Sequence, residues 1–340
     1  MVYNGRALVW LQFALCLVVI LVAGTRLARY ADVIAEKSSL GHIWVGLAVV
    51  ALVTATPEMA TSVSSAALVG SADLAVGTLI GSCCFNLSLL FVLDVVSRKG
   101  PVLARASERH LPSVRWGLVL LAVAAGGMVL SHSVELPLIG WLSIPGLILL
   151  VLYPLALRRI LKSEKRSSEQ DEDAVVRYSG LTLRGAVTRF GIAAAGVIVA
   201  GVWLSFIGDE IATVTGWGTS FVGNLFLAIA TSAPELVVSV SAVRMGFPDI
   251  ALADILGANM LDTAMIGLSD ASYVHGSLLA HASLVNVVVI VVAAIAVALA
   301  GLAIVRRHPN YTVWRFSRYG PTIAALYIGA AFVLFTFGSA

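Results

Sequence analysis

The sequence carries the same polar pattern twice, and each copy lies inside an apolar stretch. The first copy consists of Thr-Ala-Thr-Pro-Glu at 54–58, Asp-Leu-Ala at 73–75 and Gly-Ser-Cys-Cys-Phe-Asn at 81–86. The second consists of Thr-Ser-Ala-Pro-Glu at 231–235, Asp-Ile-Ala at 249–251 and Gly-Ala-Asn-Met-Leu-Asp at 257–262. A proline costs a helix one backbone hydrogen bond, and a carboxylate is costly in an apolar segment. Because both costs recur in matching places, the pattern predicts a duplicated fold with a charged site in its apolar interior.

The apolar stretches decide the fold class. Hydrophobic residues make up 59% of the 340 residues and charged residues only 12%, whereas about a quarter of a soluble domain is charged. The stretches are about 20 residues long, which suits helices rather than the alternating strands of a barrel, each of about ten residues. We therefore predict an all-α polytopic membrane protein in a lipid bilayer, with about ten transmembrane helices at 7–25, 42–67, 74–96, 114–131, 137–157, 188–208, 217–242, 249–268, 280–305 and 320–338.

The basic residues predict the orientation of these helices. With ten spans, the connecting segments alternate between the two sides of the membrane. Of the 22 Lys and Arg residues, all except Arg6 then fall on one side. The positive-inside rule makes that side cytoplasmic and places both termini outside the cytoplasm. Because the rule accounts for the basic residues, the net charge of +3 carries no nucleic-acid signal.

The spacing of the two copies predicts how the halves are related. The offset in sequence from Glu58 to Glu235 differs by a single position from the offset between Asn86 and Asp262. The second span is predicted to run outward and the seventh inward, so the halves are inverted repeats whose helices are broken at the motifs. We predict five-helix repeats at 1–158 and 188–340, joined by a polar cytoplasmic linker at 159–187. The alternative for this linker is a regulatory acidic loop that binds cations.

The residues around each proline predict a cation site. Each proline leaves a carbonyl of the preceding turn without its donor, and such oxygens can line a cation site where a cavity is present. The hydroxyl groups of Thr54, Thr231 and Ser232 add neutral oxygens, while Glu58 and Glu235 add negative charge. Hard cations such as Na⁺ and Ca²⁺ prefer a set of ligands made entirely of oxygen.

The following helix of each repeat supplies a second wall for this site. Ser82 and Asn86 are four residues apart, as are Ala258 and Asp262, so each pair shares one helix face. We expect these two faces to lie opposite the two glutamates.

Other polar residues inside the predicted spans allow more than one interpretation. Asp254 lies one turn before Ala258 and has Thr78 as its counterpart, and one role open to it is to line the cation path. Asp94, near the cytoplasmic end of the third span, is expected to form an interfacial pair with Arg98. Asp73 and Asp249 open their helices and are expected to act as N-terminal caps. The six histidines lie at predicted helix ends or in loops, and we assign no chemistry to them.

Taken together, these motifs resemble a known family. Thr-x-x-Pro-Glu followed by Asp-(Leu/Ile)-Ala and Gly-(Ser/Ala)-x-x-x-(Asn/Asp), present twice, is similar to the two alpha-repeats of the calcium/cation antiporter superfamily, and most nearly to those of its prokaryotic sodium/calcium exchangers. The similarity covers residues 45–96 and 222–268.

The resemblance implies a function for the named residues. It implies a diamond of cation sites between the second, third, seventh and eighth spans, with Glu58 and Glu235 as shared central ligands. The first and sixth spans would slide across this core as a gate. The further ligands that it implies are Thr54, Thr231, Ser82, Ser232, the backbone oxygens of Ala51 and Ala228, and, at the middle, Asn86 and Asp262.

The chain departs from the family pattern at two positions. Ala55 and Ala258 stand where the family usually has serine, while their counterparts Ser232 and Ser82 are intact. The resemblance implies that both missing hydroxyls belong to the outward monovalent site. The identity of the coupling ion therefore stays open.

We expect a secondary active antiporter that exchanges Ca²⁺ for Na⁺ by alternating access, in a prokaryotic inner membrane. An H⁺-coupled cation exchanger is the alternative within transport, and a passive channel is the alternative outside it. No HExxH or Gly-x-Ser-x-Gly motif occurs, which argues against an enzyme. Inorganic cations are the expected substrates, no cofactor is expected, and the sequence leaves the oligomeric state open.

Overall fold

The structure is a computed structural model that describes residues 2–37, 52–97, 99–165, 182–306, 312–313 and 316–338. The predicted ligand Ala51, the predicted ion-pair partner Arg98 and most of the predicted linker lie outside these residues. Nearly all described residues are helical. The long helices are α1 (Val2–Lys37), α4 (Ala72–Val96), α6 (Leu111–Ser133), α7 (Ile144–Lys165), α8 (Leu183–Thr215), α12 (Pro248–Ser272), α14 (Val285–Arg306) and α15 (Tyr319–Phe337).

The helices agree with the ten predicted spans. Within the described ranges, eight are long and apolar enough to cross a membrane. A ninth span consists of two helical parts, 219–231 and 233–244, bent by 47°. The first part contains α9 (Thr219–Val222), the π-helix η3 (Gly223–Leu227) and α10 (Ala228–Thr231), and the second part is α11 (Ala233–Arg244). The described part of the remaining span contains α3 (Thr56–Ser64) and the π-helix η1 (Ser65–Val69).

Several predicted span boundaries were wrong. α1 and α8 extend well beyond 7–25 and 188–208, because a helix continues past its apolar segment wherever its backbone bonds can form. The fifth span begins at Ile144 rather than 137, because a short hairpin of β1 (Leu138–Ile139) and β2 (Leu142–Ser143) precedes it. Its turn contains Gly140 at a φ of +67°, a backbone conformation that favours glycine. A matching hairpin of β3 (Thr312–Val313) and β4 (Phe316–Ser317) precedes α15.

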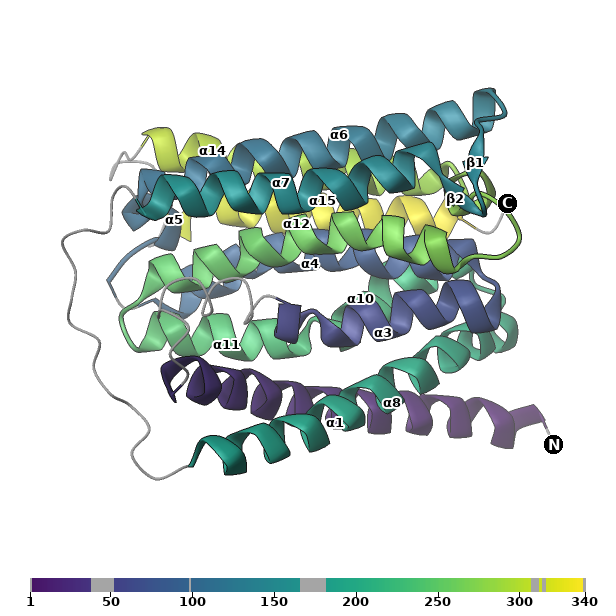
Figure 1. Cartoon of the computed structure of the whole chain (residues 1–340), viewed down its shortest axis with the longest axis horizontal. Helices are drawn as coiled ribbons and strands as arrows, with labels where there is room; N and C mark the ends of the chain where they lie inside the picture. The colour runs from purple at the N-terminus through teal and green to yellow at the C-terminus, as the bar shows by residue number, and fades with distance from the viewer. Residues whose placement is uncertain are drawn as a thin grey trace.

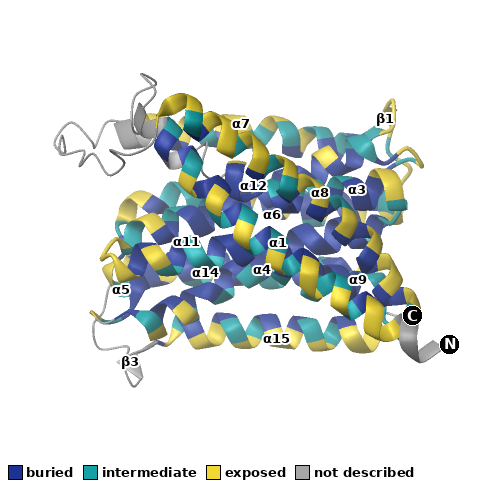
Figure 2. Ribbon diagram, turned by 90° about the horizontal axis from the view of Figure 1, so that it is seen from below, coloured by how far each residue is buried: buried dark blue, intermediate teal, exposed yellow. Residues whose placement is uncertain are grey.

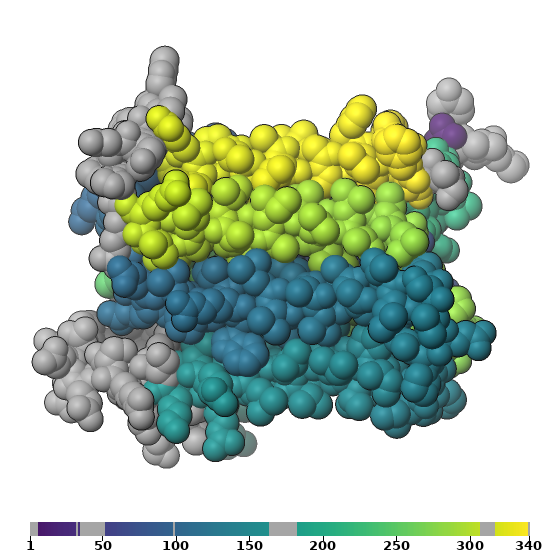
Figure 3. Space-filling model, turned by 90° about the horizontal axis from the view of Figure 1, so that it is seen from above, coloured from purple at the N-terminus to yellow at the C-terminus, as the bar shows by residue number. Residues whose placement is uncertain are grey.

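The helices form layers around α4 and α12 (Figure 1). α1 and α8 lie together on one side of the molecule, and α3 and α11 separate them from α4 and α12. On the opposite side α15, α14, α6 and α7 form four parallel bands, which Figure 3 shows as one continuous face. The start of α1 and the end of α15 lie at the same end of the bundle, as an even number of spans requires.

Burial follows the same arrangement. Figure 2 shows exposed residues gathered along the outer faces of α7 and α15, while α4 and α12 are mostly buried. The exposed side chains of the outer helices include large apolar ones such as Leu11, Ile192, Val199, Ile328 and Phe332. An apolar exterior around a core that contains buried carboxylates is the arrangement of an integral membrane protein.

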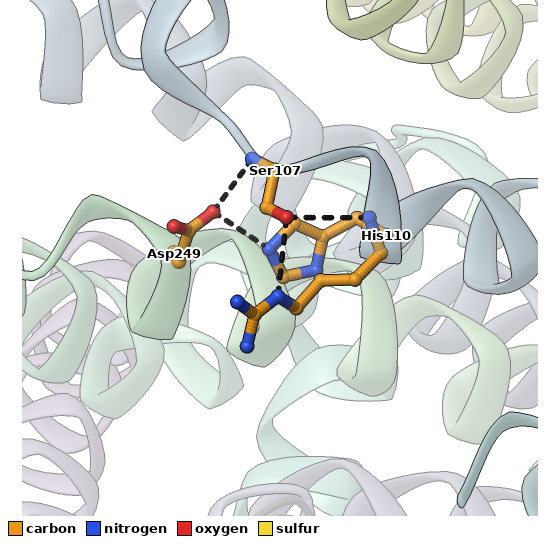
Figure 4. Close-up of polar contacts among 4 residues, drawn as sticks. Ser107, His110 and Asp249 are labelled. Atoms are coloured by element: carbon orange, nitrogen blue, oxygen red, sulfur yellow. Dashed lines mark hydrogen bonds and ion pairs between the residues drawn. The ribbon is translucent and has the colours of Figure 1, made fainter. Parts of the chain in front are cut away.

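The two halves hold the starts of α4 and α12 in the same way. Asp249 accepts hydrogen bonds from the backbone amide of Ser107 (2.8 Å) and from His110 Nε2 (2.9 Å), and Figure 4 shows both donors directed at its carboxylate. Its counterpart Asp73 accepts bonds from the amide of Ser283 (2.7 Å) and from Asn286 Nδ2 (2.9 Å). One offset in sequence relates Asp73 to Asp249, and the same offset relates the two serines to each other and His110 to Asn286.

These contacts correct the prediction of two N-terminal caps. The capping bond at the start of α4 is made by Ser71, whose hydroxyl accepts from the amide of Leu74, and α12 is preceded by Phe247, which makes no such bond. Asp73 and Asp249 instead bind the segments that lead into α14 and α6. His110 is buried and hydrogen-bonded to Asp249, although no role was predicted for it.

The other ends of α4 and α12 are held by a second pair of aspartates. Asp94 accepts from the amides of Val102 (2.8 Å) and Ser317 (3.0 Å). Its counterpart Asp270 accepts from the amides of Leu278 (2.7 Å) and Ser143 (2.7 Å). The donors begin the short helices α5 (Val102–Arg105) and α13 (Leu278–His281) and end the two hairpins. Asp94 is therefore a buried acceptor of backbone hydrogen bonds, and the expected pair with Arg98 lies outside the described residues.

Candidate functional site

Each repeat breaks its helix directly before the Pro-Glu pair. Ser232 separates α10 from α11 with φ −85° and ψ 9°, and Ala55 precedes α3 with φ −79° and ψ 8°. The proline is one of the first two residues of the new helix in both places, where its missing N–H does least harm. The predicted broken helices are confirmed, and the two breaks have nearly the same geometry.

Glu58 binds a residue of the opposite repeat. Its side chain is 1% exposed, and its Oε1 accepts a hydrogen bond from the hydroxyl of Ser232 at 2.8 Å. Its Oε2 is buried and makes no hydrogen bond to any described residue. The contact joins the helix breaks of the two repeats across the centre of the molecule.

Glu235 is the counterpart of Glu58 and is also buried. Its side chain is fully inaccessible, and within the described part of the chain neither carboxylate oxygen has a hydrogen-bond partner. The carboxylate lies within electrostatic range of Glu58, Asp254 and Asp262. Buried carboxylates that are neither paired nor hydrogen-bonded are expensive, so this arrangement requires a compensating cation or proton.

The facing helices add further oxygens of the same kind. Asn86 on α4 and Asp262 on α12 are fully buried, and no polar atom of either side chain has a hydrogen-bond partner among the described residues. The Ser82 and Thr231 hydroxyls are 3.4 Å apart, so the α4 wall touches the break in the second repeat.

The predicted ligands Thr54 and Ala228 lie in the two helices that end at the breaks. Thr54 is buried beside the first helix break. The carbonyl oxygen of Ala228 accepts from the amide of Ser232 (3.0 Å) and from the hydroxyl of Thr231 (3.2 Å), so both of its lone pairs have donors in this conformation.

The chemistry of the site is that of oxygen ligands. In the described ranges, no three His, Cys, Asp or Glu side chains lie close enough together to hold a metal ion by themselves. A cation bound between the two glutamates would therefore take its remaining ligands from hydroxyl, amide or carbonyl oxygens. Na⁺ and Ca²⁺ both accept such ligands.

Close glycine contacts place α1 and α8 over the helix breaks. A Cβ atom on Gly24 of α1 would collide with the ring of Pro234, and one on Gly201 of α8 would lie 2.8 Å from Cβ of Ala60 and 3.2 Å from the carbonyl of Pro57. Each of these two helices therefore passes directly over the broken helix of the other repeat. A larger residue at either glycine would separate them.

A polar network lies beside the site and was not predicted from the sequence. Asn224 in η3 donates to the carbonyl of Ser220 (2.8 Å) and to Asn286 Oδ1 (2.8 Å), and Tyr327 donates to its carbonyl (3.2 Å). Gly81 of α4 lies against the Asn224 backbone, where a Cβ could not fit. This network fixes the π-helix that precedes Thr231. The sequence signal that could have predicted this network is Asn224 itself, a polar side chain within the apolar stretch at 221–227.

The comparisons with known proteins agree with this geometry. The family model described as sodium/calcium exchanger protein matches residues 8–161 and 186–337, one segment for each repeat. The inner membrane protein YrbG of Escherichia coli is 27% identical over 256 residues, which cover 74% of this chain and 75% of that protein. The sodium/calcium exchanger MaX1 of Methanosarcina acetivorans is 39% identical over 71 residues, 20% of either chain.

Solved structures share the fold. The sodium-calcium exchanger NCX_Mj matches with a TM-score of 0.59 and 23% identity over 97% of this chain and 98% of its own. YfkE matches with a TM-score of 0.66 and 19% identity over 99% of this chain and 96% of its own. Since the family model covers most of the sequence in two segments, the chain belongs to the sodium/calcium exchanger protein family, whose members are membrane cation antiporters and not enzymes.

Proposed function

We propose that this protein exchanges Ca²⁺ for Na⁺ by alternating access, with Glu58 and Glu235 as shared central ligands. The observation that carries the proposal is that two fully buried glutamates, one from each repeat, retain three carboxylate oxygens that make no hydrogen bond in the described part of the chain. Ser232, Thr231, Ser82, Thr54, Asn86 and Asp262 complete the proposed ligand set. Ala228 contributes after its carbonyl is released, and Ala51 has the equivalent place in the first repeat.

The charge of the site explains why the two fluxes are coupled. Two ionised glutamates carry a charge of −2, which one Ca²⁺ or two Na⁺ ions neutralise. The empty site would hold that charge in a low-dielectric interior, which is energetically costly. The protein without a bound cation therefore changes poorly between its outward-open and inward-open states. The movement of one ion then depends on the return movement of the other. Asp262 would raise the charge to −3, so one of the three carboxyl groups is protonated in the Ca²⁺-bound state.

The moving part of the proposed cycle is the α1–α8 pair. These two helices contact each other extensively and cross the two helix breaks at Gly24 and Gly201. The rest of the bundle is joined by the aspartate contacts at both ends of α4 and α12. A pair that slides over a fixed core can open the site alternately to the two sides.

An H⁺-coupled exchanger is the second candidate. It is favoured by the two missing hydroxyls at Ala55 and Ala258 and by Asp254, whose carboxylate lies within electrostatic range of both glutamates. One relative, CaxA of Alkalimonas amylolytica, is described as a putative antiporter without a stated coupling ion.

Counter-ion-dependent flux separates these candidates. The purified protein is reconstituted into liposomes, and uptake of ⁴⁵Ca²⁺ is measured against an outward Na⁺ gradient at equal pH, and against a pH gradient without Na⁺. Uptake that requires the Na⁺ gradient supports the proposal, and uptake driven only by the pH gradient supports the alternative. Uptake without either gradient indicates a channel.

We further propose that the protein resides in a prokaryotic inner membrane with both termini outside the cytoplasm. The similarity to YrbG, an inner membrane protein, supports the location, and the sorting of Lys and Arg residues supports the orientation.

A further inference from the structure

One pair of buried polar residues near the site includes a carboxylate that its counterpart pair in the other repeat lacks. Asp254 on α12 is 8% exposed, and its Oδ2 accepts a hydrogen bond of 3.0 Å from the hydroxyl of Ser239 on α11. Ser239 is fully buried. The carboxylate of Asp254 also lies within electrostatic range of Glu58 on α3 and Glu235 on α11.

The helix geometry places this pair between the glutamates and one membrane surface. Ser239 is one turn beyond Glu235 on the same face of α11, about 6 Å closer to the turn at 244–248. Asp254 is two turns before Asp262 on α12, about 12 Å closer to the same turn. Along the helix axes, Asp254 and Ser239 therefore lie between the 244–248 turn and the glutamates.

The first repeat provides an internal control. Its residues at the same level are Ser62 and Thr78, the counterparts of Ser239 and Asp254 by the offset that relates the two motif copies. Both are uncharged, and each hydroxyl donates to a carbonyl of its own helix, Ser62 to Met59 (3.4 Å) and Thr78 to Leu74 (2.7 Å). Because the repeats are inverted, this neutral pair lies toward the opposite membrane surface. The two sides of the site therefore differ by one buried carboxylate.

We propose that Asp254 and Ser239 form a second cation position, which binds a monovalent cation on the path between the central glutamates and the 244–248 turn. One carboxylate and one hydroxyl supply a single negative charge and oxygen ligands, which match Na⁺ or H⁺ and leave Ca²⁺ to the doubly charged glutamate pair. The second position lies one turn from Ala258, where the hydroxyl found in the first repeat is absent. This inference rests on the proposed exchange and adds a position outside its central site.

The test measures binding without transport. Thermal unfolding of the purified protein in detergent is followed during a Na⁺ titration at fixed pH, a pH titration without Na⁺, and a Ca²⁺ titration. The variants are Asp254→Asn, Ser239→Ala and Glu58→Gln, and Thr78→Val is the matched control in the first repeat.

We expect Asp254→Asn to retain stabilisation by Ca²⁺ and to shift the midpoint of one monovalent titration at least tenfold. A shift in the Na⁺ titration identifies Na⁺ as the occupant, and a shift in the pH titration identifies H⁺. Ser239→Ala should give a smaller shift in the same titration, and Thr78→Val none.

Two results would overturn the inference. Asp254→Asn and Ser239→Ala could leave both monovalent titrations unchanged, or Asp254→Asn could remove stabilisation by Ca²⁺ as Glu58→Gln does. In the second case Asp254 belongs to the central site. If Glu58→Gln retains the Ca²⁺ response, the proposed function fails, whatever the result at Asp254. If Asp254→Asn does not fold, Ser239→Ala retains the charge and decides the question.

Discussion

Cys83 and Asn259 each bond to the backbone carbonyl of the other. The thiol of Cys83 donates to the backbone carbonyl of Asn259 at 3.5 Å, and the side-chain amide Nδ2 of Asn259 donates to the backbone carbonyl of Cys83 at 3.2 Å. The two residues are 176 positions apart and lie on the counterpart helices α4 and α12. Their reciprocal contact marks where the pseudo-two-fold axis passes, between the two walls of the candidate site.

The first prediction concerns the two glutamates. Glu58→Gln and Glu235→Gln should each abolish Ca²⁺ exchange, because each removes one of two charges needed to bind a divalent ion. The cation-free variants should unfold at a higher temperature than the parent, because the two buried carboxylates repel each other. ⁴⁵Ca²⁺ flux and thermal unfolding check both outcomes, with Glu210→Gln on the exposed face of α8 as the control. Substantial exchange by either variant would contradict the site assignment.

The second prediction concerns the two alanines. Ala55 and Ala258 are buried beside the site, and Ala55→Ser combined with Ala258→Ser should restore two oxygens for a monovalent ion. Ca²⁺ flux should then depend more steeply on Na⁺ and respond more strongly to voltage, since each elementary charge that crosses contributes about 2.3 kcal/mol per 100 mV. Flux measured at clamped liposome potentials checks this. An unchanged Na⁺ slope and voltage response would show that these hydroxyls do not limit coupling.

The third prediction concerns orientation. A cysteine at Ser133 should react with an impermeant thiol reagent only from outside the cell, and one at the exposed Met245 only from the cytoplasm. Ser168, beyond the described residues, should behave like Met245. The native Cys16, Cys83 and Cys84 are buried, so the background reaction is low. Labelling of both engineered sites from the same side would mean that the span count is wrong.

The fourth prediction concerns the aspartates at the helix ends. Asp270→Ala leaves the amides of Ser143 and Leu278 without their acceptor. Each buried amide so left costs about 1–3 kcal/mol. Asp94→Ala should destabilise in the same way, while Asp270→Asn, which keeps one acceptor oxygen, should lose less. Thermal unfolding in detergent measures the loss, and the ion selectivity of the remaining active protein should not change. Wild-type stability in Asp270→Ala would contradict this role.

The sequence predicted the parts of the fold that depend on local pattern. Apolar length predicted the spans, and the matching order and spacing of the motifs around Glu58 and Glu235 predicted the two repeats. The broken helices followed from the prolines, because the missing backbone bond is a property of the residue itself.

Contacts between distant residues could not be predicted in this way. Asp94 bonds to Ser317, 223 positions away, and Asp73 bonds to Asn286, 213 positions away. A carboxylate near a helix end reads equally well as a cap, an ion pair or an acceptor for another segment. Only the packing of the two repeats decides among these. The bond between Ser239 and Asp254 was not predicted. The available signal was that Asp254 is charged, whereas its counterpart Thr78 is not.

The bond between Ser232 and Glu58 has a consequence for how the protein is made. The two residues are 174 positions apart, and a ribosome that adds about 5–20 residues per second reaches Ser232 about 9–35 s after Glu58. During that interval the first half enters the membrane with a carboxylate whose partner does not yet exist. Glu58 must remain protonated or stay near water until the second half arrives. The binding site can therefore be completed only after the ribosome has passed Ser232, and a nascent chain that holds the first repeat alone cannot conduct ions through a finished site.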